Sequence, residues 1–267
     1  KAYAEGLRAL VIFTATFQDT VALETGEDSS TKPEKGSAGD LAARMSDLLL
    51  PIVKGLGSER AWVLLGTESL QTFGGSGFLQ EYPLEQYVRD AKIDTLYEGT
   101  TAIQGLDFFF RKIVKDHGQS MTTLSMQIAK FAKDLGAQGG YLDPEREALG
   151  KAMEAVQGIV GYMAGAAFQS DPRRGGDLTN LYKVGQNTSR LLLGAGDLIV
   201  GWLLLRQAEV AKAALDAGAT GKDADFYTGK IAAAKFFTHQ VLPRLQAERA
   251  MAEATDLSLM EVPESAF

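Results

Sequence analysis

The sequence predicts an all-α protein, and three observations support that prediction. Apolar residues recur at the three- and four-residue spacing of amphipathic helices through most of the 267 residues. No convincing run of alternating apolar and polar residues, the pattern of a half-buried strand, interrupts them. Stretches rich in Gly, Ser, Asp and Pro separate the periodic segments, as loops do between helices. We therefore expect a helical bundle over residues 1–118 and a second helical unit over residues 119–267.

The first half divides at its loop-forming stretches. Helical spacing predicts a helix over residues 1–23, and the polar segment 24–40 predicts an exposed, mobile loop. A second helical region covers about residues 41–72. Pro51 should break or bend it, because proline lacks the amide donor and clashes with the preceding turn. The glycine-rich turn FGGSGF, residues 73–78, ends the region.

Two further helices complete this half of the chain. Pro83 occupies a first-turn position of a helix that should end by Gly99. Thr101 and Gln104 have the spacing of a capping box, so another helix should begin there. Beyond Gly118 the sequence is rich in alanine. Its apolar spacing predicts four helices, at about residues 121–135, 144–169, 178–215 and 224–254.

Composition excludes several classes of function. The 27 basic and 34 acidic side chains give a net charge of −7, and the basic residues form no stripe, so nucleic acid is not an expected partner. The chain has no cysteine, which removes disulfides, thiolate nucleophiles and the usual structural zinc sites. His117 and His239 are far apart in unrelated surroundings, so no metal site is expected and proton transfer must fall to carboxylates, Lys or Tyr.

The longest apolar stretch, residues 191–205, contains Asp197 and three glycines and is shorter than the roughly 20 residues that span a bilayer. We interpret it as a buried helix whose small residues allow close packing. Asp197 should find a partner in Arg190, in Lys183 or in a polar group of another helix. No secretory signal opens the chain, which begins in mid-helix, so we expect a fragment of a cytoplasmic protein.

The most informative stretch is residues 71–104, which contains QTFGGSGF, then YPLEQYVRDAK, then YEGT. The three pieces in this order resemble the C-terminal helical domain of the acyl-CoA dehydrogenases, flavoenzymes that desaturate acyl-CoA thioesters. A lone FGGSGF would be interpreted as a helix-ending loop. The resemblance covers residues 1 to about 118, and the remainder resembles the extra C-terminal helical region of longer bacterial members.

The resemblance implies a role for Glu98, the glutamate of YEGT. In the family this residue removes the α-proton of the thioester while the β-hydrogen leaves as hydride to the flavin. Such a base needs apolar surroundings that raise its pKa, and Leu96 and Tyr97 precede it. Its backbone N–H would help to hold the thioester oxygen. Taken alone, a glutamate before a helix start would be interpreted as complementing the helix dipole.

The residues after Glu98 are implied to contact the ligands. Gly99 permits close approach of the acyl-CoA, since it lacks a β-carbon. The backbone of Thr100, Thr101 and Ala102 matches the segment that contacts the flavin in the family. The sequence departs from the family at Ala102, where Gln or Glu is frequent, and at Gly105, where Arg is frequent.

The glycine-rich turn is implied to contact a second flavin. In the family this segment reaches the adenine and pyrophosphate end of the FAD of a neighbouring subunit, and here it consists of Gln71, Thr72, Phe73, Gly74 and Gly75. This turn and Glu98 would then serve different flavins, which implies a homodimer or a higher homo-oligomer. Arg89 and Asp90 are expected to form an orienting ion pair rather than to act in catalysis.

Together these assignments imply FAD-dependent α,β-dehydrogenation of acyl-CoA thioesters to trans-2-enoyl-CoA, as in fatty acid β-oxidation, with electron-transferring flavoprotein as the acceptor. The family's N-terminal helical domain and middle β-domain are absent, so the chain should be part of a longer enzyme or one subunit of a split enzyme. The alternative is a non-catalytic helical interaction or scaffolding subunit. The intact Glu98 and FGGSGF favour the enzyme, and the second helical unit is expected to contribute no catalytic residue.

Overall fold

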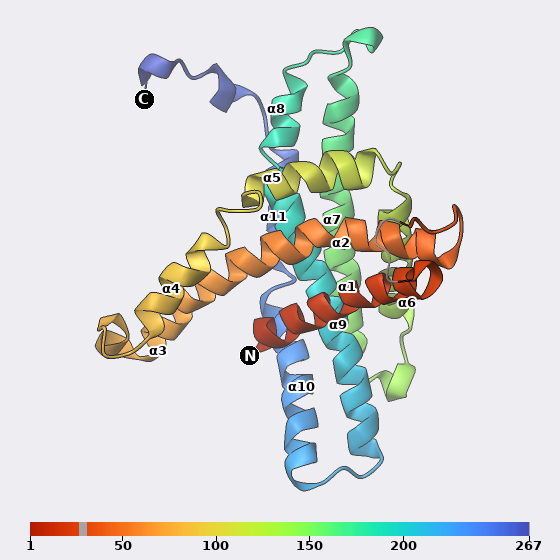
Figure 1. Ribbon diagram of the computed structural model, residues 1–267, viewed down its shortest axis with the longest axis vertical. Coiled ribbons are helices and arrows are strands. Elements are labelled where there is room, and N and C mark those ends of the chain that lie inside the picture. Colours follow the sequence, from red (N-terminus) through yellow and green to blue (C-terminus); the bar gives the residue numbers. More distant parts are fainter. Residues whose placement is uncertain (27–30, 267) are drawn as a thin grey trace. The chain divides into compact units, whose positions relative to one another are not determined.

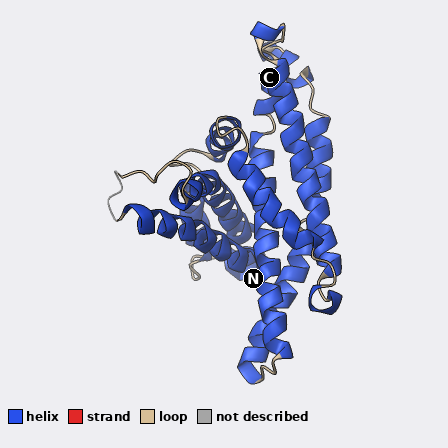
Figure 2. Cartoon of the chain, turned by 90° about the vertical axis from the view of Figure 1, so that its right-hand side faces the viewer, coloured by secondary structure: helices blue, strands red, loops and turns tan. Residues whose placement is uncertain are grey.

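The computed structural model describes residues 1–26 and 31–266, and every regular element within them is a helix (Figure 2). The predicted all-α class is therefore confirmed. The chain divides into two compact units. Residues 7–121, here called the signature unit, form one, and residues 1–6 with the segment from residue 122 onward, here called the tail unit, form the other. The sequence analysis instead assigned residues 1–6 to the first unit and placed the division at residue 118.

The signature unit is built around one long helix, α2, which packs against α4, α5 and the helical stretch η3 (Figure 1). Leu48, Leu49, Ile52 and Leu56 of α2 are almost fully buried, so this helix supplies much of the core. The elements of the unit are α1 (Ala2–Thr25, whose first residues belong to the tail unit), α2 (Ala38–Val63), η1 (Leu64–Ser69), α3 (Leu70–Thr72), η2 (Gly74–Phe78), α4 (Leu84–Ile93), α5 (Thr101–Leu106) and η3 (Asp107–Val114).

The sequence predicts a break or a bend near Pro51, and the break is wrong, because α2 continues through this residue. A proline inside a helix costs about 3 kcal/mol, whereas burying a Leu or Ile side chain contributes about 1.5–3 kcal/mol. Pro51 is itself buried beside Leu49 and Ile52, so tertiary packing outweighs the local penalty. Beyond the end of α2 at Val63, the chain continues as a π-helical stretch over Leu64–Ser69. π-helical stretches often mark functional regions.

The segment between α1 and α2 is shorter than the predicted loop 24–40, and residues 27–30 of that prediction lie outside the described residues. Glu24, still in α1, accepts hydrogen bonds from Ser37 Oγ at 2.6 Å, from the Gly39 N–H at 2.8 Å and from the Glu34 N–H at 3.0 Å. The bonds from Ser37 and Gly39 hold the pKa of Glu24 below its usual value. The described end of this segment is therefore anchored to α1.

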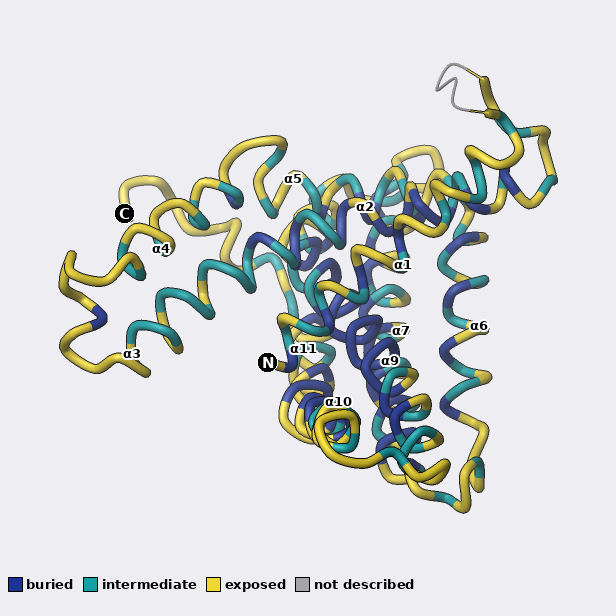
Figure 3. Tube along the Cα trace, turned by 60° about the horizontal axis from the view of Figure 1, so that its bottom comes forward, coloured by how far each residue is buried: buried dark blue, intermediate teal, exposed yellow. Residues whose placement is uncertain are grey.

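The tail unit surrounds α9, which is buried over most of its length and packs on α7, α10 and α11 (Figure 3). A β-carbon at Gly194 would lie 3.2 Å from Leu245, and one at Gly201 would lie 3.0 Å from Leu242, which confirms that these glycines allow close helix packing. The elements are α6 (Gln119–Lys133), η4 (Ala137–Gly140), α7 (Asp143–Gln169), η5 (Pro172–Arg174), α8 (Asn180–Gly185), α9 (Thr188–Asp216), α10 (Gly221–Gln240), α11 (Arg244–Glu253), η6 (Ser258–Glu261) and η7 (Glu264–Ala266).

Two predictions about the apolar stretch can be compared with the structure. The helical stretch 180–216 is long and apolar enough to cross a membrane, but 83% of its most apolar window is buried inside the protein, as in the core helix of a globular unit. Asp197 accepts a hydrogen bond from Tyr3 Oη at 3.2 Å, so a polar group of another helix is a partner. Arg190 instead pairs with Glu248 at 2.9 Å.

Candidate active site

The YEGT segment forms a turn between α4 and α5. We call residues 97–101 the YEGT turn. Thr100 is the N-cap of α5, and its side chain accepts a hydrogen bond from the Ile103 N–H at 3.5 Å. The predicted capping box of Thr101 and Gln104 is therefore wrong by one residue. The Gln104 amide Nε2 donates to the Glu98 carbonyl at 2.9 Å, so this side chain ties α5 back to the turn instead of capping it.

The backbone of the YEGT turn is left-handed at two consecutive residues. Glu98 has φ +54° and Gly99 has φ +86°. Gly99 adopts this region at no steric cost, whereas Glu98 pays about 1–2 kcal/mol, which its surroundings must offset. A β-carbon at residue 99 would lie 3.1 Å from Gln104 Nε2 and 3.3 Å from Ile103. Both the conformation and the space at this position therefore require glycine.

The turn presents unused backbone donors. Within the described part of the chain, the N–H groups of Glu98, Gly99 and Thr100 donate no hydrogen bond. They lie directly before the first turn of α5, whose own N–H groups have no acceptor within the helix. Such a run of donors suits the electron-rich oxygens of a ligand.

The described residues of the signature unit do not form the expected apolar enclosure of Glu98, since Glu98 is exposed and Leu96 and Tyr97 are each about half exposed. The Tyr97 hydroxyl donates to Asp94 Oδ1 at 2.8 Å, and this bond to a carboxylate raises the pKa of Tyr97. The Tyr97 side chain is thus held at Asp94, one turn back along the chain. Among the described residues Glu98 is therefore not buried, and its apolar surroundings stay a prediction.

Side chains of α2, which the sequence analysis missed, brace the YEGT turn. Lys54 Nζ donates to the Gly99 carbonyl, and Thr101 Oγ1 donates to Glu59 Oε1 at 2.5 Å. Trp62 Nε1 donates to the other oxygen of Glu59 at 2.9 Å. Burial tends to raise the pKa of Glu59, but the hydrogen bonds from Thr101 and Trp62 and the charge of Lys92 outweigh it, so the pKa is lowered.

A sequence signal for this bracing exists. Glu59 and Trp62 are three positions apart and therefore neighbours on the face of α2, at the end of a strongly apolar helix. A carboxylate placed there needs partners when it is partly buried. The signal does not identify those partners, because Lys54 and Glu59 contact residues that are 45 and 42 positions away along the chain.

The glycine-rich turn is far more open than the YEGT turn. We call residues 73–78 the tip turn. A β-carbon at Gly74 or Gly75 would meet no atom within 4 Å, and Gly74 has φ +59°. Phe78 is 80% exposed. The backbone at both glycines can therefore be approached closely from outside the chain, as can the exposed Gln71, Thr72 and Phe73.

One glycine of the tip turn that the sequence analysis did not single out is structural. A β-carbon at Gly77 would lie 2.6 Å from the Leu70 carbonyl oxygen and 3.0 Å from the β-carbon of Phe73. Phe73 also packs edge-on against Tyr82, with ring centroids 5.3 Å apart. Gly77 thus lets the turn close on the end of α3, whereas Gly74 and Gly75 face open space.

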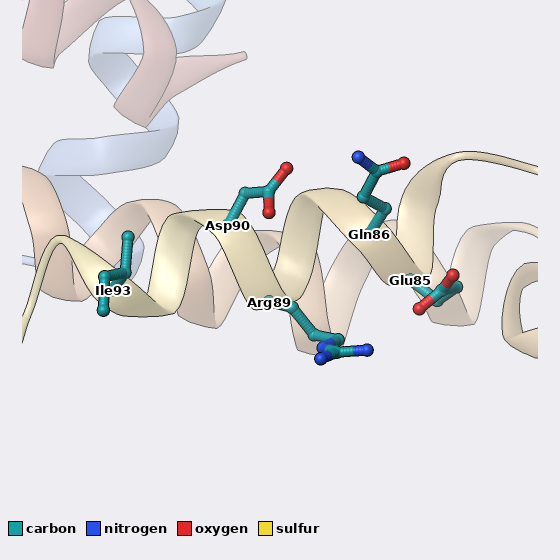
Figure 4. A pocket seen from close by; sticks show the side chains of 5 residues that line it. All are labelled: Glu85, Gln86, Arg89, Asp90 and Ile93. Atoms are coloured by element: carbon teal, nitrogen blue, oxygen red, sulfur yellow. The ribbon is translucent and has the colours of Figure 1, made fainter.

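The structure does not bring the two groups of candidate residues together. The tip turn precedes α4 and the YEGT turn follows it, and ten helical residues span about 15 Å. Between them, one face of α4 borders an open hollow of about 520 Å³ (Figure 4), lined by Glu85, Gln86, Arg89, Asp90 and Ile93. Arg89 and Asp90 point to different sides of the helix, so the expected ion pair between these two residues is wrong.

The tail unit contains a titratable cluster that sequence reasoning missed. Glu145 is 3% exposed and lies 2.9 Å from His239 Nε2 and 3.8 Å from Lys235 Nζ. The adjacent Arg146 is also buried and pairs with Glu209 at 2.6 Å. Nothing in the local sequence of His239 points to a partner 94 positions away. Among the described residues, no group of three or more His, Asp or Glu side chains could hold a metal ion.

Comparisons with known proteins match both halves of the chain. A model of the family described as "Acyl-CoA dehydrogenase, C-terminal domain" matches residues 1–108, and one described as "Acetyl-CoA dehydrogenase C-terminal like" matches residues 124–263. A broad-specificity linear acyl-CoA dehydrogenase of Mycobacterium tuberculosis, FadE5, is 54% identical over the whole chain. The chain spans about two-fifths of the length of the curated relatives it matches, 41% in the case of FadE5.

Two solved structures share the fold. An acyl-CoA dehydrogenase of Bacillus anthracis in complex with FAD superimposes with a TM-score of 0.63 at 16% identity, over 99% of this chain and 41% of that one. ACDH-11 of Caenorhabditis elegans in complex with C11-CoA superimposes with a TM-score of 0.62 at 19% identity, over 95% of this chain and 38% of that one. At these identities the likeness concerns the fold alone.

Proposed function

Because this chain belongs to the acyl-CoA dehydrogenase family, we propose that the enzyme containing it converts acyl-CoA thioesters to trans-2-enoyl-CoA with FAD. The observation that carries the proposal is the YEGT turn. There an exposed Glu98 carboxylate stands beside three unused backbone N–H groups in a left-handed turn that only a braced backbone maintains. This combination offers a base and oxyanion donors within one short segment.

In the proposed reaction, the Glu98 carboxylate accepts the α-proton of the thioester. The electron pair of that C–H bond becomes part of the new double bond as the β-hydrogen leaves with its own pair. FAD, when bound, supplies the acceptor for that hydride. The Glu98 N–H donates to the thioester oxygen, where negative charge develops. Gly99 leaves the space that the substrate needs, since a side chain there would already crowd Gln104.

The residues present fit FAD at two places. The N–H groups that begin α5, at Thr100, Thr101 and Ala102, are donors suited to flavin oxygens. At the tip turn, the open backbone of residues 74 and 75 can approach a pyrophosphate without steric obstruction. In the family these two places serve different flavins, and on that ground we infer a homodimer or a higher homo-oligomer. We assign electron-transferring flavoprotein as the acceptor on family grounds.

The test is Glu98→Gln in the complete enzyme. The variant keeps the shape and the backbone donors but removes the base, so FAD and acyl-CoA should still bind while flavin reduction slows by at least about 100-fold. Stopped-flow bleaching of the flavin measures this rate. Glu147→Gln, at an exposed position of α7, is the matched control and should reduce normally. Near-normal reduction in Glu98→Gln would reject Glu98 as the base.

The same measurement separates the enzyme from the alternative of a scaffolding subunit. An enzyme of this kind is yellow, and its flavin bleaches when an acyl-CoA is added. A scaffolding subunit that has kept only the bundle would carry no flavin, or a flavin that acyl-CoA does not reduce. The presence of a braced, donor-lined turn around Glu98 favours the enzyme, since packing a bundle requires no such turn.

A further inference from the structure

Two hydrogen bonds join the YEGT turn to α2, one at the Gly99 carbonyl and one at the Thr101 hydroxyl. Lys54 Nζ donates to the Gly99 carbonyl, and the Thr101 hydroxyl donates to Glu59 at 2.5 Å. One bond has a lysine as its donor and the other has a carboxylate as its acceptor, and charge-assisted hydrogen bonds are stronger than neutral ones. The turn is therefore attached at two points to the most deeply packed helix of the signature unit.

Trp62 in turn holds the Glu59 carboxylate in place. Trp62 Nε1 donates to the second oxygen of Glu59 at 2.9 Å, so both oxygens of the carboxylate are occupied. Lys92, on α4, lies over the Trp62 ring at 4.2 Å from its centroid. The lysine of the RDAK piece of the signature is thereby linked to the threonine after YEGT through two residues of α2. Lys92 therefore helps to hold Trp62 and, through Trp62 and Glu59, the Thr101 side chain.

The backbone of the turn needs such support. Glu98 lies in the left-handed region, which is unfavourable for a residue with a side chain, and such strain persists only where surrounding contacts over-determine it. Gln104 of α5 holds the Glu98 carbonyl from one side of the turn. Lys54 and Glu59 hold the turn from α2, by hydrogen bonds to Gly99 and Thr101.

We propose that Lys54 and Glu59 are positioning residues, which hold the YEGT turn so that the Glu98 carboxylate stays in reach of the α-carbon. The proposal rests on the assignment of Glu98 as the base. Neither side chain needs to touch substrate or flavin, since each acts through an atom of the turn. Their loss should therefore slow proton removal while leaving binding intact, because misplacement of a reacting group by about 1 Å costs on the order of 100-fold in rate.

The experiment uses the complete, flavin-loaded enzyme with Lys54→Met and Glu59→Gln. The first keeps the length of the side chain and removes the donor, and the second leaves a side chain that cannot accept from Thr101 and Trp62 through two oxygens. Flavin reduction at saturating acyl-CoA should fall by about 10- to 100-fold. Flavin content and the Kd for acyl-CoA should stay at the wild-type level.

Lys112→Met is the matched control. Lys112 Nζ binds Asp47 of α2 at 2.5 Å, so the variant also removes a hydrogen bond from a lysine that involves this helix, at a place away from the YEGT turn. It should reduce at the wild-type rate. Lys54→Arg, which restores a cationic donor, should recover part of the rate lost in Lys54→Met. A rate loss matched by an equal loss of flavin content or of substrate affinity, or an equal loss in Lys112→Met, would overturn the proposal, since it would report a general structural effect.

A double-mutant cycle tests whether Glu59 acts through Thr101. Thr101→Val removes the hydroxyl at constant volume, so the variant with Glu59→Gln as well should be no slower than the slower single variant. Multiplied rate losses would overturn the pairing. Glu98→Gln is measured in parallel. If it is slow while Lys54→Met and Glu59→Gln are normal, the proposed function stands and the positioning role is wrong; if Glu98→Gln is normal, the proposed function fails and this inference fails with it.

Discussion

The YEGT turn and the tip turn belong to one sequence signature, yet they are built in opposite ways. Both contain a glycine with positive φ, Gly99 in the first and Gly74 in the second. Around Gly99, side chains from α2 and α5 fill the space and hold the backbone. Around Gly74 and Gly75 there is open space, and Phe78 beside them is 80% exposed.

The difference shows what each glycine is for. At Gly99 the contacts within this chain already require glycine, so its presence alone says little about a ligand. At Gly75 no described atom lies within 4 Å of the position of a β-carbon, which is consistent with the proposed approach of a ligand. Variants of the YEGT turn should therefore lower the rate of flavin reduction. Variants of Gly74 or Gly75 in the tip turn should instead weaken flavin binding and subunit assembly.

The largest expected effect is on stability and concerns Gly77, which belongs to the open tip turn but is itself closely packed. The β-carbon of Gly77→Ala would fall 2.6 Å from the Leu70 carbonyl oxygen. Overpacking of this kind costs about 1–3 kcal/mol, so the melting temperature of the enzyme should drop. Gly75→Ala, two residues away, should melt as wild type. Equal melting temperatures for the two variants would show that the tip turn is not closed on α3.

A second pair compares the two left-handed glycines directly. Gly99→Ala and Gly74→Ala both place a β-carbon at positive φ, at a cost of about 1–2 kcal/mol each. Only at residue 99 does the new carbon also crowd Gln104 and Ile103. Gly99→Ala should lower the rate of flavin reduction while flavin is retained, and Gly74→Ala should lose flavin and subunit assembly first. Absorbance, stopped-flow reduction and sedimentation separate these outcomes, and the same loss in both variants would remove the distinction between the turns.

The smallest expected effect is on acid stability. The pKa of Glu59 is lowered from its ordinary 4.5 in the folded protein. The stability that this carboxylate contributes is present above the unfolded pKa and is lost as the pH falls through the folded one. Melting temperatures measured from pH 7 downward should therefore fall more steeply below about pH 4.5 in wild type than in Glu59→Gln. Parallel curves would show that Glu59 is not bound to Thr101 and Trp62 as a carboxylate.

Much of the fold could be predicted from the sequence, and the errors share a cause. The helical class, the FGGSGF turn and the turn at YEGT follow from spacing and turn residues within short windows. The errors concern competition between local and tertiary effects: Pro51 remains in a helix because its neighbours are buried, and the cap of α5 is Thr100 because Gln104 is used elsewhere. The expected pair of Arg89 and Asp90 fails because adjacent helical residues do not face each other.

For the candidate site, the sequence by itself selected the candidate residues, namely Glu98, its glycine and the open glycines of the tip turn, and their chemical roles stay a prediction. Only the tertiary structure decided how they are held and kept apart. Lys54 reaches Gly99 across 45 positions, and Tyr3 reaches Asp197 across 194. Helix periodicity, caps and turns depend on residues a few positions apart, so they can be predicted from short stretches of the sequence. Contacts such as these depend on how whole helices pack, and no local pattern encodes them.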